Sequence, residues 1–452
     1  MYKITVKTLF GLEEILAEEI KALGYSNVNI LNRAVQLEGD IKAVYELNFK
    51  LRTAISVLIE VKSFVLKDAD DLYKKCKQID WTSFFDIDKT FAVKGAVFSQ
   101  LYTHTQYPYL VVKDAIADVF RDKVGDRPNV NLKSPQVLFD LYIKEKEVVI
   151  SMNTSGAPLY QRGYRQMTGE APLNEVLAAG MIQLSGWDKK SDFIDPFCGS
   201  GTLLIEAALM AADIPAMIER EHYAFKNFKN YNHEVWMDVY ENVNRKPIRA
   251  DFKIIGADND ATMIQKARRN SRSAPTGRMI DLVVSDFKEL ENVPEKGTII
   301  TNPPYGERIG EEIEELYTEF GNFMKQNLVG YNCWILSGNV DALKLVGLKP
   351  SKKIKLYNGK LECSFRKFEI YEGSKKVLNQ DNIEDKKEVS TESTSKESKR
   401  EKPKSVKPKS EEENKSENIE KSESSSNKTD KPEKKINVPT TKDKINKYKR
   451  RR

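Results

Sequence analysis

Apolar residues recur with two different periods along the chain, and the first segment shows both. Residues 3–8 alternate between polar and apolar side chains, as a half-buried strand does. Within residues 11–23, apolar side chains then recur at helical spacing, at Leu12, Ile15, Leu16 and Ile20. Further apolar segments predict strands over 28–30, 34–37 and 54–61 and a helix over 41–49. This βαββαβ order predicts a ferredoxin-like unit in residues 1–62.

Residues 63–155 continue with a mixed pattern that predicts a separate, compact α+β module. The periodicity indicates helices over 69–78 and 108–120 and strands over 90–97, 137–143 and 147–151. The charged triplet Lys144-Glu145-Lys146 marks a turn between the last two strands.

Residues 156–373 alternate strands with helices, which predicts a doubly wound parallel sheet of the α/β class. The expected strands cover 192–195, 252–257, 281–284, 297–301 and 332–337, and the expected helices cover 202–211, 261–271 and 311–326. Two last strands, over 352–357 and 361–371, flank Asn358-Gly359, a dipeptide typical of a tight hairpin. The fold prediction is a Rossmann-like sheet closed by an antiparallel edge hairpin.

Composition separates residues 374–452 from everything before them. This stretch holds 24 Lys and Arg and 16 Asp and Glu among Ser, Asn, Thr and Pro. Its few apolar residues cannot offset the chain entropy of folding, so we expect a disordered, charged tail. The tail's charge of +8 exceeds the net +6 of the whole chain, so the preceding residues together have no net positive charge. Their total charge therefore gives no support for a polyanion partner. The basic end of the tail could touch nucleic acid or only keep the protein soluble.

The four cysteines and three histidines show no metal-binding or disulfide spacing, so neither kind of site is expected. The N-terminus has the alternation of a strand rather than the pattern of a signal peptide. No apolar run reaches membrane-spanning length. These features predict a soluble, cytoplasmic protein that holds no metal.

One glycine-rich turn stands where a parallel sheet binds ligands. The segment Asp195-Pro196-Phe197-Cys198-Gly199-Ser200-Gly201-Thr202 follows a predicted strand and opens a helix. It lacks the third glycine of the dinucleotide fingerprint and carries a carboxylate before the turn. That carboxylate suits the ammonium group of S-adenosylmethionine, which has no pyrophosphate to be held. The alternative is a tight turn in which Asp195 caps the following helix.

Two more carboxylates follow later strands. Asp258, with Asn259 beside it, ends the second strand and is expected to bind ribose hydroxyls. Asp286 ends the third strand and is expected to accept the adenine amino group of the same cofactor. Each aspartate alone is equally consistent with a helix cap. All three, however, fall at the carboxyl ends of consecutive strands, where Rossmann-type ligands bind.

Asn302-Pro303-Pro304-Tyr305 follows the fourth strand and suits chemistry on a planar amino group. The Asn302 side chain and the Pro303 carbonyl can accept both N–H groups and pull the nitrogen towards tetrahedral geometry. Pro303 and Pro304 hold the turn rigid, and Tyr305 can stack on a base. Together with the glycine-rich turn, this motif indicates methyl transfer to a nitrogen, best suited to a nucleobase.

The linker before the sheet mixes aromatic residues and arginines. Arg162, Tyr164 and Arg165 are candidate RNA contacts because arginine binds phosphates and tyrosine stacks on bases. The two arginines could equally pin the linker to the catalytic domain.

Several segments together resemble the THUMP-domain RNA guanine-N2 methyltransferases, in particular the N-terminal half of the bacterial 23S ribosomal RNA enzyme. These segments are Gly11-Leu12-Glu13-Glu14, Tyr160–Arg165, Ala171–Glu175, the turn after Asp195, Asn302–Tyr305 and Leu356–Cys363. The resemblance covers residues 1–371. It implies a THUMP RNA-binding domain in residues 63–155 and a class I methyltransferase domain in residues 156–373. The cofactor it implies is S-adenosylmethionine, in a site lined by Asp195, Gly199, Asp258, Asp286 and Asn302.

The implied activity is methylation of the exocyclic N2 of guanine in 23S rRNA, either naked or within a pre-ribosomal particle. Methylation of guanine N2 in tRNA, methylation of adenine N6 and a non-catalytic RNA-binding role in ribosome assembly remain as alternatives. Asn174 stands where members of the family often carry Lys, which leaves its effect on cofactor or substrate affinity open.

Overall fold

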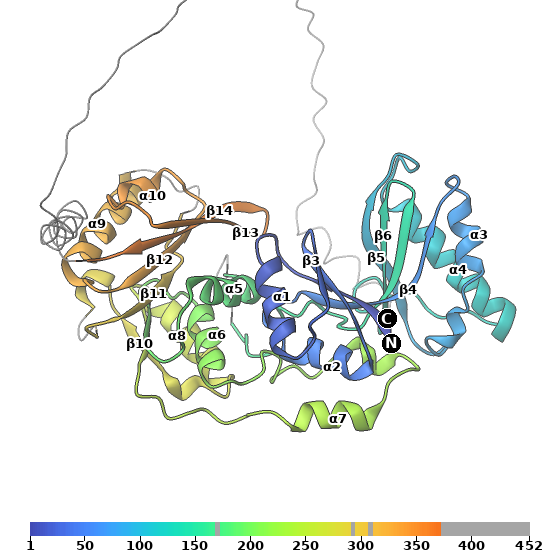
Figure 1. Ribbon diagram of the computed structural model, residues 1–452, viewed down its shortest axis with the longest axis horizontal. Coiled ribbons are helices and arrows are strands. Elements are labelled where there is room, and N and C mark those ends of the chain that lie inside the picture. The colour runs from blue at the N-terminus through green and yellow to red at the C-terminus, as the bar shows by residue number, and fades with distance from the viewer. Residues whose placement is uncertain (168–171, 291–293, 306–310, 372–452) are drawn as a thin grey trace, which may run out of the picture. The chain divides into compact units, whose positions relative to one another are not determined.

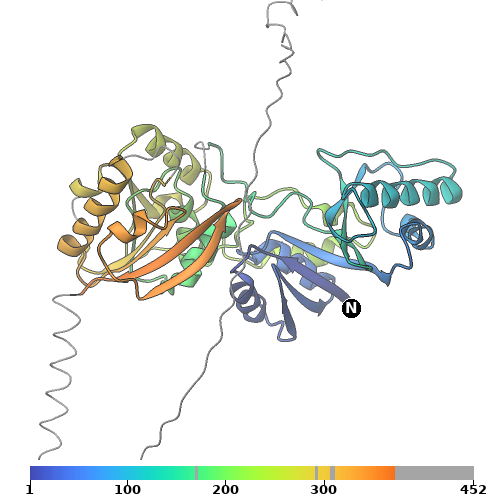
Figure 2. The ribbon, with the colours of Figure 1, turned by 90° about the horizontal axis from the view of Figure 1, so that it is seen from above.

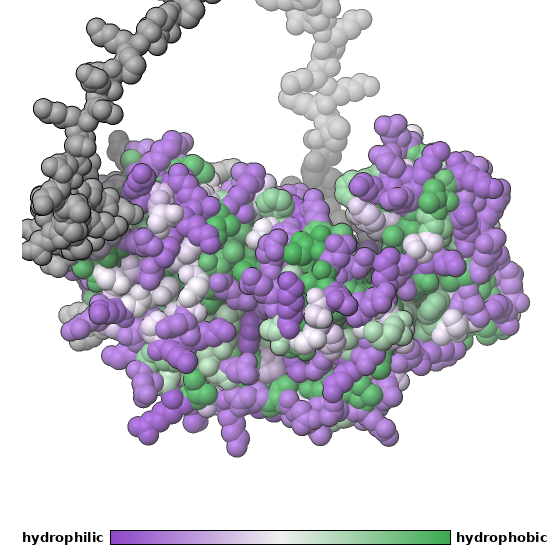
Figure 3. All heavy atoms as spheres, in the orientation of Figure 1, coloured by the Kyte–Doolittle hydropathy of each residue, from purple (hydrophilic) through white to green (hydrophobic). Residues whose placement is uncertain are grey.

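The computed structural model describes residues 1–167, 172–290, 294–305 and 311–371, which include two seven-stranded sheets (Figure 1). The predicted tail, residues 374–452, lies outside the described residues. One view of the surface shows hydrophilic residues over most of its area, with hydrophobic residues gathered in a few patches (Figure 3). Within the described part of the chain, no helix is both long and apolar enough to cross a membrane.

The first sheet begins with the predicted βαββαβ order. Its elements are β1 (Tyr2–Lys7), α1 (Glu13–Ala22), β2 (Val28–Leu31), β3 (Ala34–Gly39), α2 (Ile41–Lys50) and β4 (Ser56–Val65). The alternation predicted for the first strand is kept in β1, where Ile4 and Val6 are fully buried and their neighbours are not. Asp40 caps α2 by accepting a hydrogen bond from the Ala43 amide, at 2.8 Å.

The second module completes the same sheet rather than forming one of its own. It contributes α3 (Asp71–Lys77), β5 (Phe91–Phe98), α4 (Tyr107–Val124), β6 (Val137–Lys144) and β7 (Glu147–Asn153). The strand order is β2-β3-β1-β4-β7-β6-β5, because β4 pairs with β1 at its beginning and with β7 along most of its length. The boundary expected between residues 62 and 63 therefore lies inside β4.

The second sheet has the predicted Rossmann-like arrangement with an antiparallel edge. Its strands are β8 (Asp192–Asp195), β9 (Ile254–Asp258), β10 (Ile280–Val284), β11 (Gly297–Thr301), β12 (Asn332–Ser337), β13 (Lys352–Asn358) and β14 (Leu361–Glu369). The order is β10-β9-β8-β11-β12-β14-β13, in which the first five strands are parallel and the last two form the hairpin. Gly359 takes a φ of +64° at the hairpin turn, a conformation that favours glycine. The α/β fold class and the edge hairpin are confirmed.

Four longer helices accompany this sheet: α5 (Glu175–Ser185), α6 (Thr202–Ala211), α8 (Ala261–Arg272) and α9 (Glu311–Asn327). The sequence prediction missed two others, α7 (His233–Glu241) and the short α10 (Ala342–Leu345). Helix α7 lies in the long insertion between α6 and β9, and it packs on α2. Its Trp236 ring contacts the rings of Tyr45 and Phe49, with centroids 5.9 and 5.6 Å apart. The insertion thus joins the second sheet to the N-terminal module.

Candidate active site

Four predicted site residues meet at one edge of the second sheet. Asp195, Asp258 and Asp286 follow β8, β9 and β10, and Asn302 follows β11. These strands are adjacent in the order β10-β9-β8-β11 and run parallel, so their carboxyl ends lie side by side. The structure therefore brings together the residues that the sequence placed on separate strand ends.

Asp195 is the most buried of these carboxylates, with 2% of its surface exposed. Its Oδ1 accepts hydrogen bonds from the Thr301 hydroxyl at 2.6 Å and from the Phe197 amide at 3.2 Å. Burial raises the pKa of Asp195 to about 7, against the lowering effect of these two hydrogen bonds. Asp195 thus fixes the turn and links β8 to the end of β11. Its Oδ2 makes no hydrogen bond to any other described residue.

The glycine-rich turn is held from the neighbouring strand by Asp258. Asp258 Oδ2 accepts a hydrogen bond from the Gly199 amide at 2.9 Å, and its Oδ1 accepts one from the Asp260 amide at 3.0 Å. Burial raises the pKa of Asp258. Gly199 and Gly201 both have positive φ, and a Cβ at Gly199 would meet nothing within 4 Å. An open backbone surface beside Asp258 is therefore available to a ligand.

The remaining residues of the turn have mixed surroundings. Cys198 is buried, and burial raises the pKa of its thiol well above the ordinary value, which argues against a reactive thiolate. The Phe197 ring packs against Phe287 and Phe320, with centroids 5.3 and 5.1 Å apart. Asn259 is exposed next to Asp258.

Asp286 caps a short helix, which is the alternative role that the sequence left open for it. Its Oδ1 accepts a hydrogen bond from the Lys288 amide at 2.9 Å and so caps the 3-10 turn Phe287–Glu289. Its Oδ2 makes no hydrogen bond within the described residues. A capping role does not prevent this second oxygen from binding an amino group.

The Asn302–Tyr305 turn presents an unpaired acceptor. Asn302 Oδ1 is inaccessible to solvent and has no hydrogen-bond partner among the described residues. Pro303 is buried and Pro304 is exposed. A buried acceptor without a donor costs about 1–3 kcal/mol, so a ligand N–H placed at this oxygen would be favourable. The residues that follow this turn, 306–310, lie outside the described part of the chain.

Tyr305 is oriented by the edge hairpin. Its hydroxyl accepts a hydrogen bond from Asn358 Nδ2 at 3.0 Å, and burial raises its pKa to about 12. A Cβ added at Gly338 would lie 2.6 Å from the Leu361 side chain and 3.2 Å from the Tyr305 ring, so glycine at this position leaves room for both. The sequence motif Asn358-Gly359, first interpreted only as a turn signal, therefore supplies a side chain to the candidate active site.

The linker residues proposed as RNA contacts point inward instead. Arg162 is fully buried, and its Nε lies 3.2 Å from Glu206 Oε1, which also accepts a hydrogen bond from the Tyr164 hydroxyl at 2.9 Å. Arg162 and Tyr164 are both buried, which favours the alternative that the linker is pinned to the catalytic domain, and RNA contact by these residues stays a prediction. The physical reason is the buried carboxylate of Glu206 on α6, which needs a cationic partner.

Arg165 supports the glycine-rich turn from the other side. Its guanidinium pairs with Glu175 at 2.6 Å and donates to the hydroxyls of Thr202 at 2.9 Å and Ser200 at 3.3 Å. The Arg165 side chain is 14% exposed, so most of its surface contacts other residues of the domain.

One asparagine beside the glycine-rich turn was not recognised from the sequence, and another has a capping role. Asn270 on α8 accepts hydrogen bonds from the amides of Gln166 and Met167 and donates one to the Ser200 carbonyl at 3.0 Å. It therefore fastens the linker to the glycine-rich turn, and nothing in its sequence context signals this. Asn174 caps α5 by accepting a hydrogen bond from the Val176 amide at 2.9 Å.

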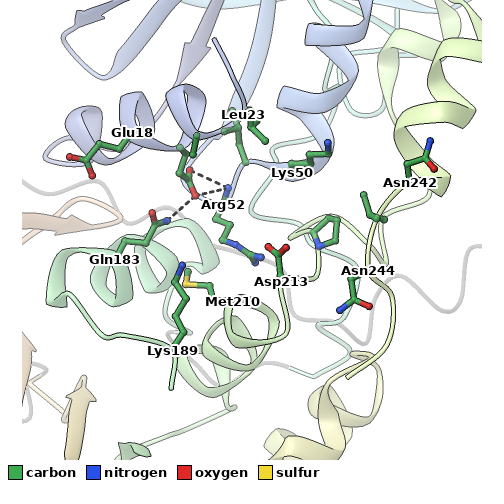
Figure 4. A pocket seen from close by; sticks show the side chains of 15 residues that line it. Glu18, Leu23, Lys50, Arg52, Gln183, Lys189, Met210, Asp213, Asn242 and Asn244 are labelled. Atoms are coloured by element: carbon green, nitrogen blue, oxygen red, sulfur yellow. Dashed lines mark hydrogen bonds between the residues drawn. The ribbon is translucent and has the colours of Figure 1, made fainter. Parts of the chain in front are cut away.

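A pocket of about 650 Å³ lies away from these strand ends, and its lining includes Glu19, Arg52, Gln183 and Asp213. Figure 4 shows Arg52 extending from the N-terminal module towards Asp213. Arg52 Nη2 donates to the Ile214 carbonyl at 2.6 Å, and Gln183 donates to Glu19 at 2.8 Å. These contacts connect the N-terminal module to the second sheet, which is a structural role. Among the described residues, no acidic, histidine or cysteine cluster could hold a metal ion.

Family models match three consecutive segments of the chain. They are the RlmL ferredoxin-like domain over residues 3–58, the THUMP domain over residues 67–153 and the RMKL-like methyltransferase domain over residues 162–367. The curated "Ribosomal RNA large subunit methyltransferase K/L" of Psychromonas ingrahamii is 35% identical over 378 residues, which are 82% of this chain and 50% of that protein. The chain thus spans about half the length of the curated relatives it matches.

Solved structures are matched over almost their full length. A predicted N6-adenine-specific DNA methylase from Listeria monocytogenes is 30% identical, with a TM-score of 0.72, and the match covers 82% of this chain and 96% of that one. A protein described as a methyltransferase and crystallised with SAH is 26% identical, with a TM-score of 0.73 and coverage of 82% and 99%. The chain belongs to the RMKL-like methyltransferases that carry RlmL ferredoxin-like and THUMP domains before the methyltransferase domain.

Proposed function

We propose that this protein methylates the exocyclic N2 of a guanine in RNA, with S-adenosylmethionine as the methyl donor and 23S rRNA as the substrate. The observation that carries this proposal is the buried Asn302 Oδ1 at the end of β11, beside the glycine-rich turn, which has no hydrogen-bond donor among the described residues. An amino N–H is the donor that this acceptor lacks.

The residues at the strand ends fit the cofactor. Asp195, Phe197 and Cys198 through Thr202 would hold its amino-acid part, Asp258 and Asn259 its ribose, and Asp286 its adenine amino group. The open face at Gly199 admits a ligand against the backbone, and Asp195 and Asp286 each keep one carboxylate oxygen free of hydrogen bonds to described residues. S-adenosylmethionine supplies an electrophilic methyl group when it is bound. A related structure was solved with SAH, which supports this assignment.

Asn302 and Pro303 would activate the acceptor nitrogen by accepting its two N–H groups. These hydrogen bonds draw the nitrogen out of conjugation with the ring, so its lone pair becomes available for in-line attack. A nitrogen–carbon bond forms as the sulfur–carbon bond of the donor breaks, and the nitrogen then becomes cationic. Its proton is acidic at that stage and leaves to solvent, so a strong general base is not required.

Tyr305 would hold the plane of the base. Its pKa of about 12 keeps the phenol neutral at physiological pH, and the hydrogen bond from Asn358 fixes the hydroxyl end of the ring. A neutral, fixed ring can stack on a base that is taken out of its own stack.

RNA as the substrate is supported by the THUMP and RlmL ferredoxin-like models and by the name of the curated relatives. Adenine N6 remains the second candidate, because a related structure is described as an N6-adenine-specific methylase and both targets are planar amino groups. tRNA is an alternative substrate for the same chemistry.

Mass spectrometry of nucleosides from fractionated rRNA and tRNA, with and without the gene, tests the proposal. Loss of N2-methylguanosine from 23S rRNA is the expected result. Loss of N2-methylguanosine from tRNA alone would mean that tRNA is the substrate. Loss of N6-methyladenosine would mean that the target is adenine and not guanine. If neither pool changes and purified protein with labelled S-adenosylmethionine methylates none of these RNAs, the proposal is refuted.

A further inference from the structure

Two motifs that are far apart in the sequence meet in space. The segment Gly11-Leu12-Glu13-Glu14 precedes and begins α1, and Leu356–Cys363 forms the β13–β14 hairpin. Gly11 has a φ of +86°, and a Cβ there would lie 2.9 Å from the Lys355 carbonyl. Both ribbon views show the orange-red hairpin reaching the blue N-terminal module (Figures 1 and 2). The backbone of the N-terminal module therefore packs directly on the hairpin that orients Tyr305.

We propose that Phe10, Arg33 and Tyr357 form a platform on which the single-stranded RNA next to the target base stacks. The Phe10 and Tyr357 rings lie edge to face, with centroids 5.6 Å apart. The Arg33 guanidinium carbon lies 6.0 Å from the Phe10 ring centroid and 5.9 Å from that of Tyr357. Phe10 is 37% exposed and Arg33 is exposed, so this cluster is accessible to a ligand in solution. The inference rests on the proposed RNA substrate and adds the surface that would hold it.

Hydrogen bonds hold the two loops of the platform in place. Glu13 accepts hydrogen bonds from the Gly11 amide at 2.7 Å and from the Arg33 amide at 3.0 Å, so one carboxylate fixes both loops. Arg33 has a φ of +56°, a left-handed conformation that is uncommon for residues other than glycine. This conformation is usual in a two-residue hairpin turn, which Arg33 forms between β2 and β3.

Charge favours RNA as the occupant. The hairpin from Lys352 to Glu362 carries four lysines and one glutamate, and that glutamate pairs with Lys355 at 2.7 Å. Lys353 and Lys355 share a strand face with Tyr357, and the Lys355 amine lies 5.5 Å from the Tyr357 ring centroid. Aromatic faces beside cations are the usual means of holding single-stranded nucleic acid.

The platform also lies next to the proposed chemistry. Tyr357 precedes Asn358, whose side chain donates to Tyr305 on the amino-acceptor turn. Successive strand residues point to opposite faces, so Tyr357 and Asn358 lie on two sides of the same hairpin. A base held at Tyr305 on one side and a neighbouring nucleotide on the platform on the other side can belong to the same RNA strand, which would pass over this hairpin.

Fluorescence anisotropy with the full chain and a short labelled single-stranded oligoribonucleotide tests the platform. Phe10→Leu and Tyr357→Leu keep apolar volume but remove the flat ring, and Arg33→Gly keeps the left-handed backbone but removes the charge. Each is expected to weaken binding roughly 5- to 100-fold, from the alanine-scan range for base stacking. The matched control is Arg245→Ala, which removes an arginine stacked on Tyr240 at 4.1 Å on the insertion. It should leave RNA affinity unchanged.

Thermal unfolding of the same variants separates binding from packing. The expected result is an unchanged Tm together with weaker RNA binding and an unchanged affinity for S-adenosylmethionine. Wild-type RNA affinity in all three variants would overturn the platform, as would a loss of affinity matched by a loss of folded protein. Neither result decides the proposed methyl transfer, which the nucleoside analysis of the gene deletion tests separately. If the wild-type protein methylates no RNA but the variants still weaken RNA binding, the proposed function is refuted and the platform is supported.

Discussion

The burial of Asp195 makes a specific prediction about stability. Its pKa is raised from 3.8 to about 7 because the carboxylate is buried. An acid whose pKa is higher in the folded state is destabilising once the unfolded chain ionises, and the effect grows from about pH 4 to pH 7. At about 1.4 kcal/mol for each pH unit, the difference corresponds to about 4 kcal/mol at neutral pH and above. Such a value is a large part of the roughly 5–15 kcal/mol that stabilises an ordinary domain.

Asp195→Asn should therefore stabilise the protein without ligand, increasingly so as the pH rises. The asparagine Oδ1 can still accept from the Thr301 hydroxyl and the Phe197 amide, while the charge is gone. The stability difference between variant and wild type should increase by roughly 2.5 kcal/mol between about pH 5 and pH 8. Differential scanning calorimetry at both pH values measures this as a Tm difference of several degrees.

Asp188→Asn is the matched control with the opposite sign. Asp188 precedes the same strand, and hydrogen bonds from the Lys190 and Ser191 amides lower its pKa. Its charge stabilises the fold above about pH 4, so the asparagine variant should be the less stable one at neutral pH. The reasoning on Asp195 is refuted if the Asp195→Asn difference stays constant between about pH 5 and pH 8.

Asn302→Ala should reduce methyl transfer at least about 100-fold while S-adenosylmethionine affinity, measured by calorimetry, stays within a few-fold; equal activity would remove Asn302 from the acceptor role. Asp258→Ala should instead raise the Kd for S-adenosylmethionine about 10-fold or more, and an unchanged Kd would count against a ribose contact. Arg162→Ala should lower the unfolding free energy by about 3–5 kcal/mol in urea, because Glu206 is left buried without its partner. Asn358→Ala should lower kcat more than it changes RNA affinity, since it only orients Tyr305, and a loss of RNA binding alone would argue against that role.

Most helices and strands, and the strand ends that carry the site, could be predicted from the sequence alone. Hydrophobic periodicity is local, so the helix and strand order over residues 1–371 was readable, and the edge hairpin followed from Asn358-Gly359. The expected order of parallel strands then placed Asp195, Asp258 and Asn302 at one edge, as the observed sheet does. Helix α7 was missed although its apolar residues recur at helical spacing, and aromatic contacts hold it against the distant helix α2.

Which polar side chains face inward, and which modules are in contact, became visible in the three-dimensional packing alone. From the local sequence, Arg162 and Arg165 suit contacts with RNA and contacts within the protein equally well. In the structure they pair with the buried Glu206 and Glu175, so both make internal contacts. Gly11 and Lys355 are far apart in the chain, so their backbone contact could not be seen from either motif. Ion-pair partners and close backbone approaches depend on long-range packing, which a single sequence does not encode in any local pattern.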